Sequence, residues 1–213
     1  MEENSYLICD SNICVYRTLA NIEPKIYDEL IHKVKDRIAR HTNDYNAEIV
    51  VTKTVKSEIM DENEETYILP KIIRDFCVER LKYKPYDYNI LKLQKQATKS
   101  LRKFTDKNRI EKKLPCFQAK HKYINIIKNF YLNHPDILEK ITEEKVRKAK
   151  KPKEKRRQRP DNLPEKGDLK LLSECIEIKE SREEPVALFS QDSDYTNFKE
   201  KIREEFEINI EHV

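Results

Sequence analysis

The chain has 213 residues, of which 38% are hydrophobic and 38% are charged, and its formal net charge is +4. This length predicts one domain, either plain or carrying a large insertion. The single glycine, Gly167, excludes the glycine-rich phosphate loops of the Walker and dinucleotide-binding types, because those loops need several residues with unusual backbone angles. It also counts against an all-β fold that is rich in tight turns.

The apolar residues fall into short runs and helical repeats that alternate along the chain. In chain order, the patterns predict a strand over 5–10, a helix over 24–40, a strand over 47–52, a short helix that Thr52 caps, helices over 64–82, 89–104 and 117–132, a helix after Pro135, a helix over 168–178, a strand over 185–192, a helix over 195–206 and a strand over 206–213. This alternation predicts an α/β fold with a central, mainly parallel sheet flanked by helices.

The sequence also bears on the cellular setting. It contains no run of about 18 apolar residues, so no membrane span is expected, and its first ten residues lack the basic and apolar regions of a secretory signal. The five cysteines are odd in number and form no CxxC pair, which counts against a disulfide framework or a zinc ribbon. We therefore expect a cytoplasmic protein without a membrane partner.

Charge is unevenly distributed along the chain. Residues 1–94 have a balance of −3, residues 95–160 have +15 and residues 161–213 have −8. The basic maximum lies in a segment that we expect to form a mobile loop over 145–164. Its cations suit a phosphate backbone, and the candidate nucleic-acid contacts are Lys148, Lys150, Lys151, Lys153, Lys155, Arg156, Arg157 and Arg159. A solvated, charged linker is the alternative interpretation.

Four carboxylates stand at positions that a parallel sheet brings together. Asp10 and Asp192 end two predicted strands, and the carboxyl ends of such strands share one edge, where ligands bind. Glu58 lies in the short helix after the second strand, and Asp168 begins a helix. Clustered carboxylates repel one another unless a cation compensates them, and Mg²⁺ and Mn²⁺ prefer carboxylate oxygens. Beside a basic segment, this pattern suggests metal-dependent phosphodiester hydrolysis.

These segments resemble the PIN-domain nucleases. ICDSNICVY (8–16) is similar to the opening strand and turn of the family, VVTKTVKSEI (50–59) to its second strand and glutamate helix, GDLKLLSECIEI (167–178) to the helix with the third acid, and ALFSQDSDYTNF (187–198) to its T-x-D-x-D-F signature, with Ser190 and Tyr195 in place of Thr and Phe. The resemblance covers 5–60 and 165–212. It implies a single PIN-like domain over 1–213, with a basic helical insertion over 61–164 that is longer than usual for the family.

The resemblance also implies roles for individual residues. Asp10, Glu58, Asp168 and Asp192 would be the catalytic acids that bind Mg²⁺ or Mn²⁺, and Asp194 would assist them. Asn12 and Ser190 would orient a carboxylate or a phosphate by hydrogen bonding. The expected activity is hydrolysis of single-stranded or structured RNA by a metal-activated water, leaving a 5′-phosphate and a 3′-hydroxyl. An inhibitor protein and a second copy of the chain are candidate partners.

The sequence also permits other interpretations of these residues and of the function. Asp10 could simply end a strand, Asp168 could be a helix N-cap, and Asp192 with Asp194 could form an Asx-turn. Glu58 has neighbouring rivals in Glu48, Asp61 and Glu62. A non-catalytic nucleic-acid-binding module is the second functional hypothesis. A phosphatase of the haloacid dehalogenase type is a third, although the chain lacks the second aspartate of the DxDxT motif.

Overall fold

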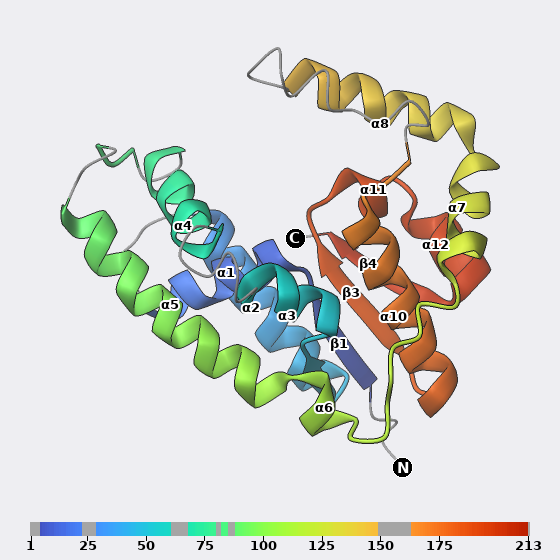
Figure 1. Ribbon diagram of the computed structural model, residues 1–213, viewed down its shortest axis with the longest axis horizontal. Coiled ribbons are helices and arrows are strands. Elements are labelled where there is room, and N and C mark those ends of the chain that lie inside the picture. The colour runs from blue at the N-terminus through green and yellow to red at the C-terminus, as the bar shows by residue number, and fades with distance from the viewer. Residues whose placement is uncertain are drawn as a thin grey trace.

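The computed structural model describes residues 5–22, 29–60, 68–79, 82–84, 88–148 and 163–212. At its centre is a sheet of four parallel strands in the order β2-β1-β3-β4 (Figure 1). The strands are β1 (Ser5–Cys9), β2 (Ala47–Val50), β3 (Val186–Ser190) and β4 (Ile208–His212). The predicted α/β class and the parallel sheet are thus confirmed.

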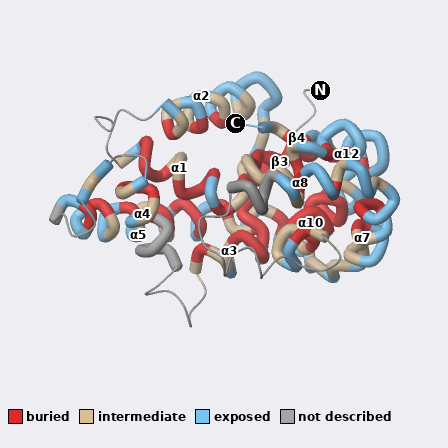
Figure 2. The backbone as a smooth tube through the Cα atoms, turned by 90° about the horizontal axis from the view of Figure 1, so that it is seen from above, coloured by how far each residue is buried: buried red, intermediate tan, exposed pale blue. Residues whose placement is uncertain are grey.

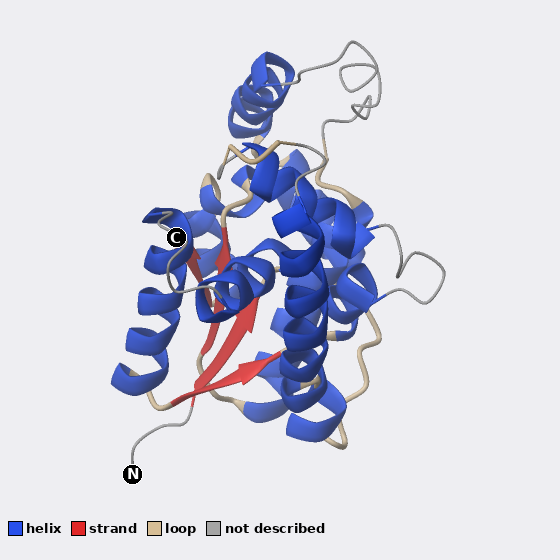
Figure 3. Cartoon of the chain, turned by 90° about the vertical axis from the view of Figure 1, so that its left-hand side faces the viewer, coloured by secondary structure: helices blue, strands red, loops and turns tan. Residues whose placement is uncertain are grey.

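The two central strands are buried along their whole length. Every residue of β1 and β3 is buried, whereas the edge strand β4 alternates between buried and exposed positions. Continuous apolar runs are typical of parallel strands that helices cover on both faces. Figure 3 shows the strands enclosed by helices, and Figure 2 shows α2 (Glu29–Asp44) on one side of β3 and β4 and α10 (Lys166–Arg182) on the other.

The remaining helices pack around this central layer or against one another. They are α1 (Ser11–Ile22), α3 (Lys53–Met60), α4 (Ile68–Glu79), α5 (Tyr88–Asn108), α6 (Ile110–Lys113), α7 (Ile124–Leu132), α8 (Pro135–Lys148), α11 (Ser193–Thr196) and α12 (Lys199–Phe206). α1 contacts α2 and α5, and α4 contacts α5. Within the described residues, no helix combines the length and the apolar character that crossing a membrane requires.

Several predicted boundaries were wrong. The helix expected over 24–40 is α2 (Glu29–Asp44), which continues four residues past the predicted end, whereas the predicted start lies outside the described residues. α1 was not predicted, because its buried residues include the contiguous trio Ile13, Cys14 and Val15, which hides the helical repeat. The helix expected over 195–206 is divided into α11 and α12.

Part of the segment expected to be a mobile loop is helical. α8 continues to Lys148, so residues 145–148 belong to a helix. Residues 149–162 lie outside the described residues, and with them all the predicted nucleic-acid contacts except Lys148.

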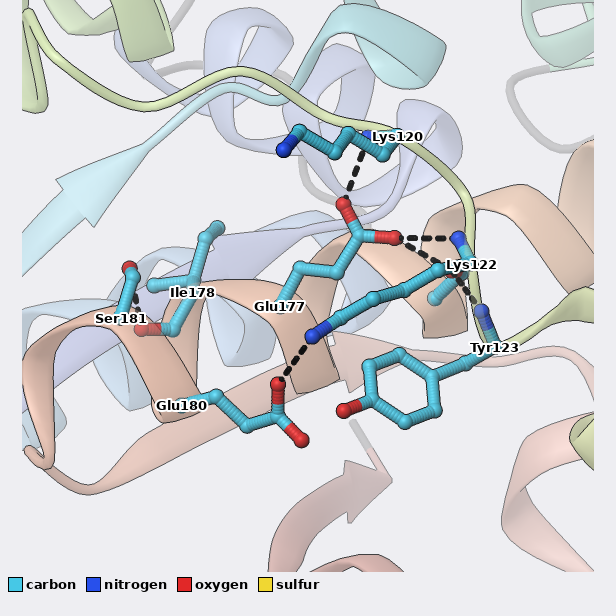
Figure 4. Close-up of polar contacts among 8 residues, drawn as sticks. Lys120, Lys122, Tyr123, Glu177, Ile178, Glu180 and Ser181 are labelled. Atoms are coloured by element: carbon cyan, nitrogen blue, oxygen red, sulfur yellow. Dashed lines mark hydrogen bonds and ion pairs between the residues drawn. The ribbon is translucent and has the colours of Figure 1, made fainter.

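Residues 117–123, which we call the strap, form an irregular connection that crosses α10 (Figure 4). The buried Glu177 carboxylate accepts hydrogen bonds from the backbone amides of Lys120 at 2.7 Å and Lys122 at 2.8 Å. It also accepts one from the Ser173 hydroxyl at 2.9 Å. These contacts explain why the helix predicted to begin at residue 117 begins only at Ile124, since the strap amides bond to a side chain instead of to a helical carbonyl.

Candidate metal centre

The carboxyl ends of the two central strands carry Asp10 and the serine that donates a hydrogen bond to it, Ser190. Asp10 follows β1 directly, and its backbone amide donates to the Phe189 carbonyl at 3.0 Å. The Asp10 carboxylate accepts from the Ser11 amide at 2.6 Å and from the Ser190 hydroxyl at 2.8 Å. Because β1 and β3 are adjacent and parallel, their ends meet at one edge of the sheet, as the strand pattern predicts.

Glu58 of α3 reaches the same edge from a third segment. Its carboxylate accepts a hydrogen bond from the Ser11 hydroxyl. A Cβ atom built on Gly167 would lie 2.7 Å from Glu58 Oε1, so this carboxylate lies against the first turn of α10. α3 itself begins after Thr52, whose hydroxyl accepts from the Val55 amide at 3.3 Å, as the sequence predicts.

Three further acids form a compact group at the starts of α10 and α11. Asp168, Asp192 and Asp194 each offer a carboxylate oxygen, and these oxygens lie within 4.8 Å of one another. Asp192 caps α11 and accepts from the Asp194 amide at 2.8 Å. Asp168 is the third residue of α10, where it forms a capping box with the N-cap residue Glu165.

Asp168 therefore does not occupy the N-cap position that the sequence allowed for it. Its acidic side chain still contributes to the start of the helix, because the Glu165 amide donates to it at 3.1 Å. A capping contact and a place in the acidic group are thus combined in one residue, as they are in Asp192.

The electrostatics indicate a shared region of negative potential. Burial raises the pKa of Asp10, and the charge of Asp192 raises it further, against the lowering effect of the hydrogen bonds from Ser190 and Ser11. Burial also raises the pKa of Glu58, to which the charges of Asp10 and Glu174 add. The groups that raise these two pKa values besides burial are carboxylates, so each carboxylate is destabilised by its neighbours.

Besides burial, the same negative charge raises the pKa values of two buried tyrosines, Tyr195 and Tyr131. Burial raises the pKa of Tyr195 well above its ordinary value, and Asp168 and Asp10 raise it further. Burial does the same to Tyr131, with added effects from Asp194, Asp168 and Asp192. The Tyr195 hydroxyl donates to the Asp168 carbonyl at 2.9 Å, and the Tyr131 hydroxyl donates to the Asp194 carbonyl at 2.7 Å. Tyr195 therefore links α11 to α10 through the backbone of Asp168, and Tyr131 links α7 to α11 through the backbone of Asp194.

The structure brings the predicted acids together, but not every predicted supporting residue. Ser190 bonds to Asp10, as expected of an orienting residue. Asn12 is exposed, and the neighbouring Ser11 makes the contact with Glu58. Among the rivals of Glu58, Glu48 lies on β2 and pairs with Lys113 at 2.5 Å, whereas Asp61 and Glu62 lie outside the described residues.

One acid near the site was missed by the sequence analysis. Glu174 of α10 is fully buried and accepts from the Thr54 amide at 3.3 Å through both oxygens. Burial raises its pKa, and bonds from Thr52 and Thr54 lower it. Its signal was available, since a glutamate within the apolar repeat of 169–178 must be buried with a partner. It holds the start of α3, the helix that carries Glu58.

The arrangement has the chemistry of a site for a hard cation. Its donors are carboxylate oxygens, which suit Mg²⁺ or Mn²⁺ rather than the thiolate and imidazole sites typical of zinc. Asp168, Asp192 and Asp194 have the spacing to hold one ion, and Asp10 and Glu58 lie at the same rim. No protein-family model, no curated protein and no solved structure matches the chain.

Proposed function

We propose that the chain is a metal-dependent endoribonuclease of the PIN class, which hydrolyses RNA phosphodiester bonds with Mg²⁺ or Mn²⁺. One observation carries the proposal: acids that are up to about 180 residues apart in sequence meet at the carboxyl edge of a parallel sheet. The Ser190–Asp10 hydrogen bond joins two strand ends, and Glu58 lies against the helix turn that carries Asp168. Ligands of parallel α/β sheets bind at this edge.

The crowding of the acids supports a cation as their natural partner. Like charges a few ångströms apart raise one another's pKa and cost stability, and a divalent cation removes that cost. In two-metal phosphodiesterases, the cations supply an activated water and stabilise the leaving oxygen. A site rich in carboxylates, in a chain whose residues 95–160 have a charge balance of +15, therefore supports phosphoryl chemistry better than it supports a purely structural role.

The order of the acids supports the PIN assignment within this class. Asp10 follows the first strand, Glu58 lies in the helix after the second, Asp168 opens a long helix and Asp192 follows the third strand. Residues 61–164 would form a large basic helical insertion between the second and third acids.

Each residue then has a definite task. Asp168, Asp192 and Asp194 would hold the principal ion, and Asp10 with Glu58 would complete its coordination or hold a second ion. Ser190 and the Ser11 amide orient the two oxygens of Asp10, and the Ser11 hydroxyl orients Glu58. Cleavage would leave a 5′-phosphate and a 3′-hydroxyl.

An Asp10→Asn variant tests this function. Cleavage of a labelled single-stranded RNA by the wild-type chain should require Mn²⁺ or Mg²⁺ and stop in EDTA. The variant should lose more than the roughly 10–100-fold that substitutions of outer-shell groups cost, while still binding the RNA. Asp36→Asn, at an exposed position of α2, is the matched control and should cleave normally. Cleavage that survives either EDTA or Asp10→Asn would refute the proposal, and binding without any cleavage would favour the nucleic-acid-binding module.

A further inference from the structure

α5 carries a row of lysines along one side. Its 21 residues include Lys92, Lys95, Lys99, Lys103 and Lys107, which follow one another at intervals of three or four residues. Such intervals place side chains on the same face of a helix. All five are exposed, and we call them the lysine stripe.

The stripe faces away from the protein core. The buried side of α5 includes Leu93, Ala97 and Leu101, and α5 packs against α1 and α4. In Figure 1, α5 forms an outer edge of the molecule, with no described element beyond it. The lysines are thus free of steric cover within the part of the chain that the structure describes.

Within the described residues, the stripe is a region of net positive charge. Elsewhere, Lys113, Lys122 and Lys179 pair with glutamates. Among the described residues, none of the five stripe lysines has an ion-pair partner. The helix contains one acid, Asp106. A row of cations without internal partners is complementary to an extended polyanion.

We propose that the lysine stripe binds the phosphate backbone of a single-stranded RNA. From Lys92 to Lys107 the helix rises about 22 Å, a length over which one strand stacked as in a duplex, with a rise of about 3.4 Å per phosphate, presents about six phosphates. A groove on the flank of the stripe is lined by Lys95, Lys99 and Lys103, by Arg102 as a further cation, and by one acid, Asp106.

The composition of the face favours RNA over a membrane surface. A helix that lies on a bilayer needs a broad apolar face opposite its cations, but the apolar face of α5 is buried against α1 and α4, and Leu91 is the one large hydrophobic residue that it exposes among those described. The C-terminal end of the stripe also lies near the site elements. The Val51 amide donates to the Asn108 carbonyl at 2.8 Å, and Val51 precedes the cap of α3.

This inference deepens the proposed ribonuclease function, on which it rests for the choice of RNA, by naming the surface that holds the substrate strand. Binding can be measured without cleavage. The probe is a fluorescent uridine 20-mer, titrated in EDTA with the full chain at several salt concentrations. The test variant is Lys95→Glu/Lys99→Glu/Lys103→Glu. The matched control, Lys33→Glu/Lys199→Glu/Lys201→Glu, changes the net charge equally at exposed positions of α2 and α12.

The stripe variant should bind at least about tenfold more weakly than the control, and the slope of log K against log salt should be shallower by about 2, because three phosphate contacts are lost. Acetylation footprinting of the wild-type chain gives a readout that does not depend on variants, since bound RNA should protect Lys95, Lys99 and Lys103. Equal affinities and slopes for the two variants, without protection, would overturn the proposal. Loss of binding to phosphatidylserine vesicles but not to the RNA would also overturn it.

The outcome of the Asp10→Asn test is independent of the outcome of the lysine-stripe test. If Asp10→Asn still cleaves while the stripe variant loses RNA binding, the acidic site is misassigned and the stripe stands. If Asp10→Asn abolishes cleavage while the stripe variant binds normally, the nuclease stands and the strand is held elsewhere.

Discussion

Gly167 is the chain's single glycine, and it lies where α10 passes Glu58. Its φ is not positive, so backbone conformation alone does not require glycine. The requirement comes from space, because a Cβ atom there would lie 2.7 Å from Glu58 Oε1. The absent side chain allows a carboxylate from α3 to approach the helix turn that carries Asp168.

We predict that Gly167→Ala separates metal binding from stability. The added methyl group should displace the Glu58 carboxylate. Mn²⁺ affinity and the rate of RNA cleavage should then fall at least about tenfold, as they do when a residue that positions a metal ligand is changed. Stability should change little, because alanine is favoured over glycine in a helix by about 0.5–1 kcal/mol, which offsets the local shift. Calorimetric Mn²⁺ titration and thermal melting give the two readouts. Lys166→Ala is the neighbouring control, and wild-type Mn²⁺ affinity in Gly167→Ala would contradict the prediction.

At the scale of elements, α10 contributes both to the acidic group and to the packing of the strap. Its first turn contributes Asp168, and its middle holds the strap through Glu177. The same helix contains an exposed ion pair, since Glu180 contacts Lys122 Nζ at 2.7 Å (Figure 4). Two glutamates one turn apart therefore contact the same strap, one with a buried carboxylate and one at the surface.

This pair permits a matched prediction about stability. Glu177→Ala should lower the free energy of unfolding by about 2–4 kcal/mol, because two backbone amides lose a charged acceptor. Glu180→Ala should cost less than about 1 kcal/mol, since exposed ion pairs contribute little. Urea denaturation followed by circular dichroism measures both. Equal losses in the two variants would show that the buried carboxylate does not anchor the strap.

At the scale of the whole molecule, the acidic edge couples stability to pH. Burial and neighbouring carboxylates raise the pKa values of Asp10 and Glu58 in the folded chain. Between the ordinary pKa and the raised one, the folded state binds more protons than the unfolded state. The contribution of these groups to stability is therefore favourable at low pH and lost as pH rises through the raised values.

We predict that Mn²⁺ stabilises the chain more at pH 7.5 than at pH 5, because the ion binds the ionised carboxylates and competes with protons. At a concentration about 100 times Kd, binding adds about 2.7 kcal/mol, which raises the Tm of a chain of this size by roughly 5–10 °C. Thermal melts with Mn²⁺ and with EDTA at the two pH values measure the difference. An equal Mn²⁺ effect at both pH values would mean that these acids do not bind the ion.

Much of the site was predictable because its signals are local. A buried strand can be recognised from a run of apolar residues, and an acid at the end of a parallel strand has only one edge of the sheet to occupy. Asp10 and Asp192 follow from that rule, and the Thr52 cap follows from the residue that precedes α3. The burial of Glu174 could be inferred from the apolar repeat around it, but its partner Thr54 and the partner of Ser11, Glu58, come from other segments of the chain.

The sequence by itself determined the fold class, the parallel sheet and the acids at its carboxyl edge, because hydrophobic periodicity and strand ends are properties of short segments. Only the tertiary structure decided that the strap is not helical, that Gly167 admits Glu58, and that no acid among the described residues pairs with the lysines of α5. Each of these depends on contacts between residues far apart in the chain, and such contacts leave no local pattern in the sequence.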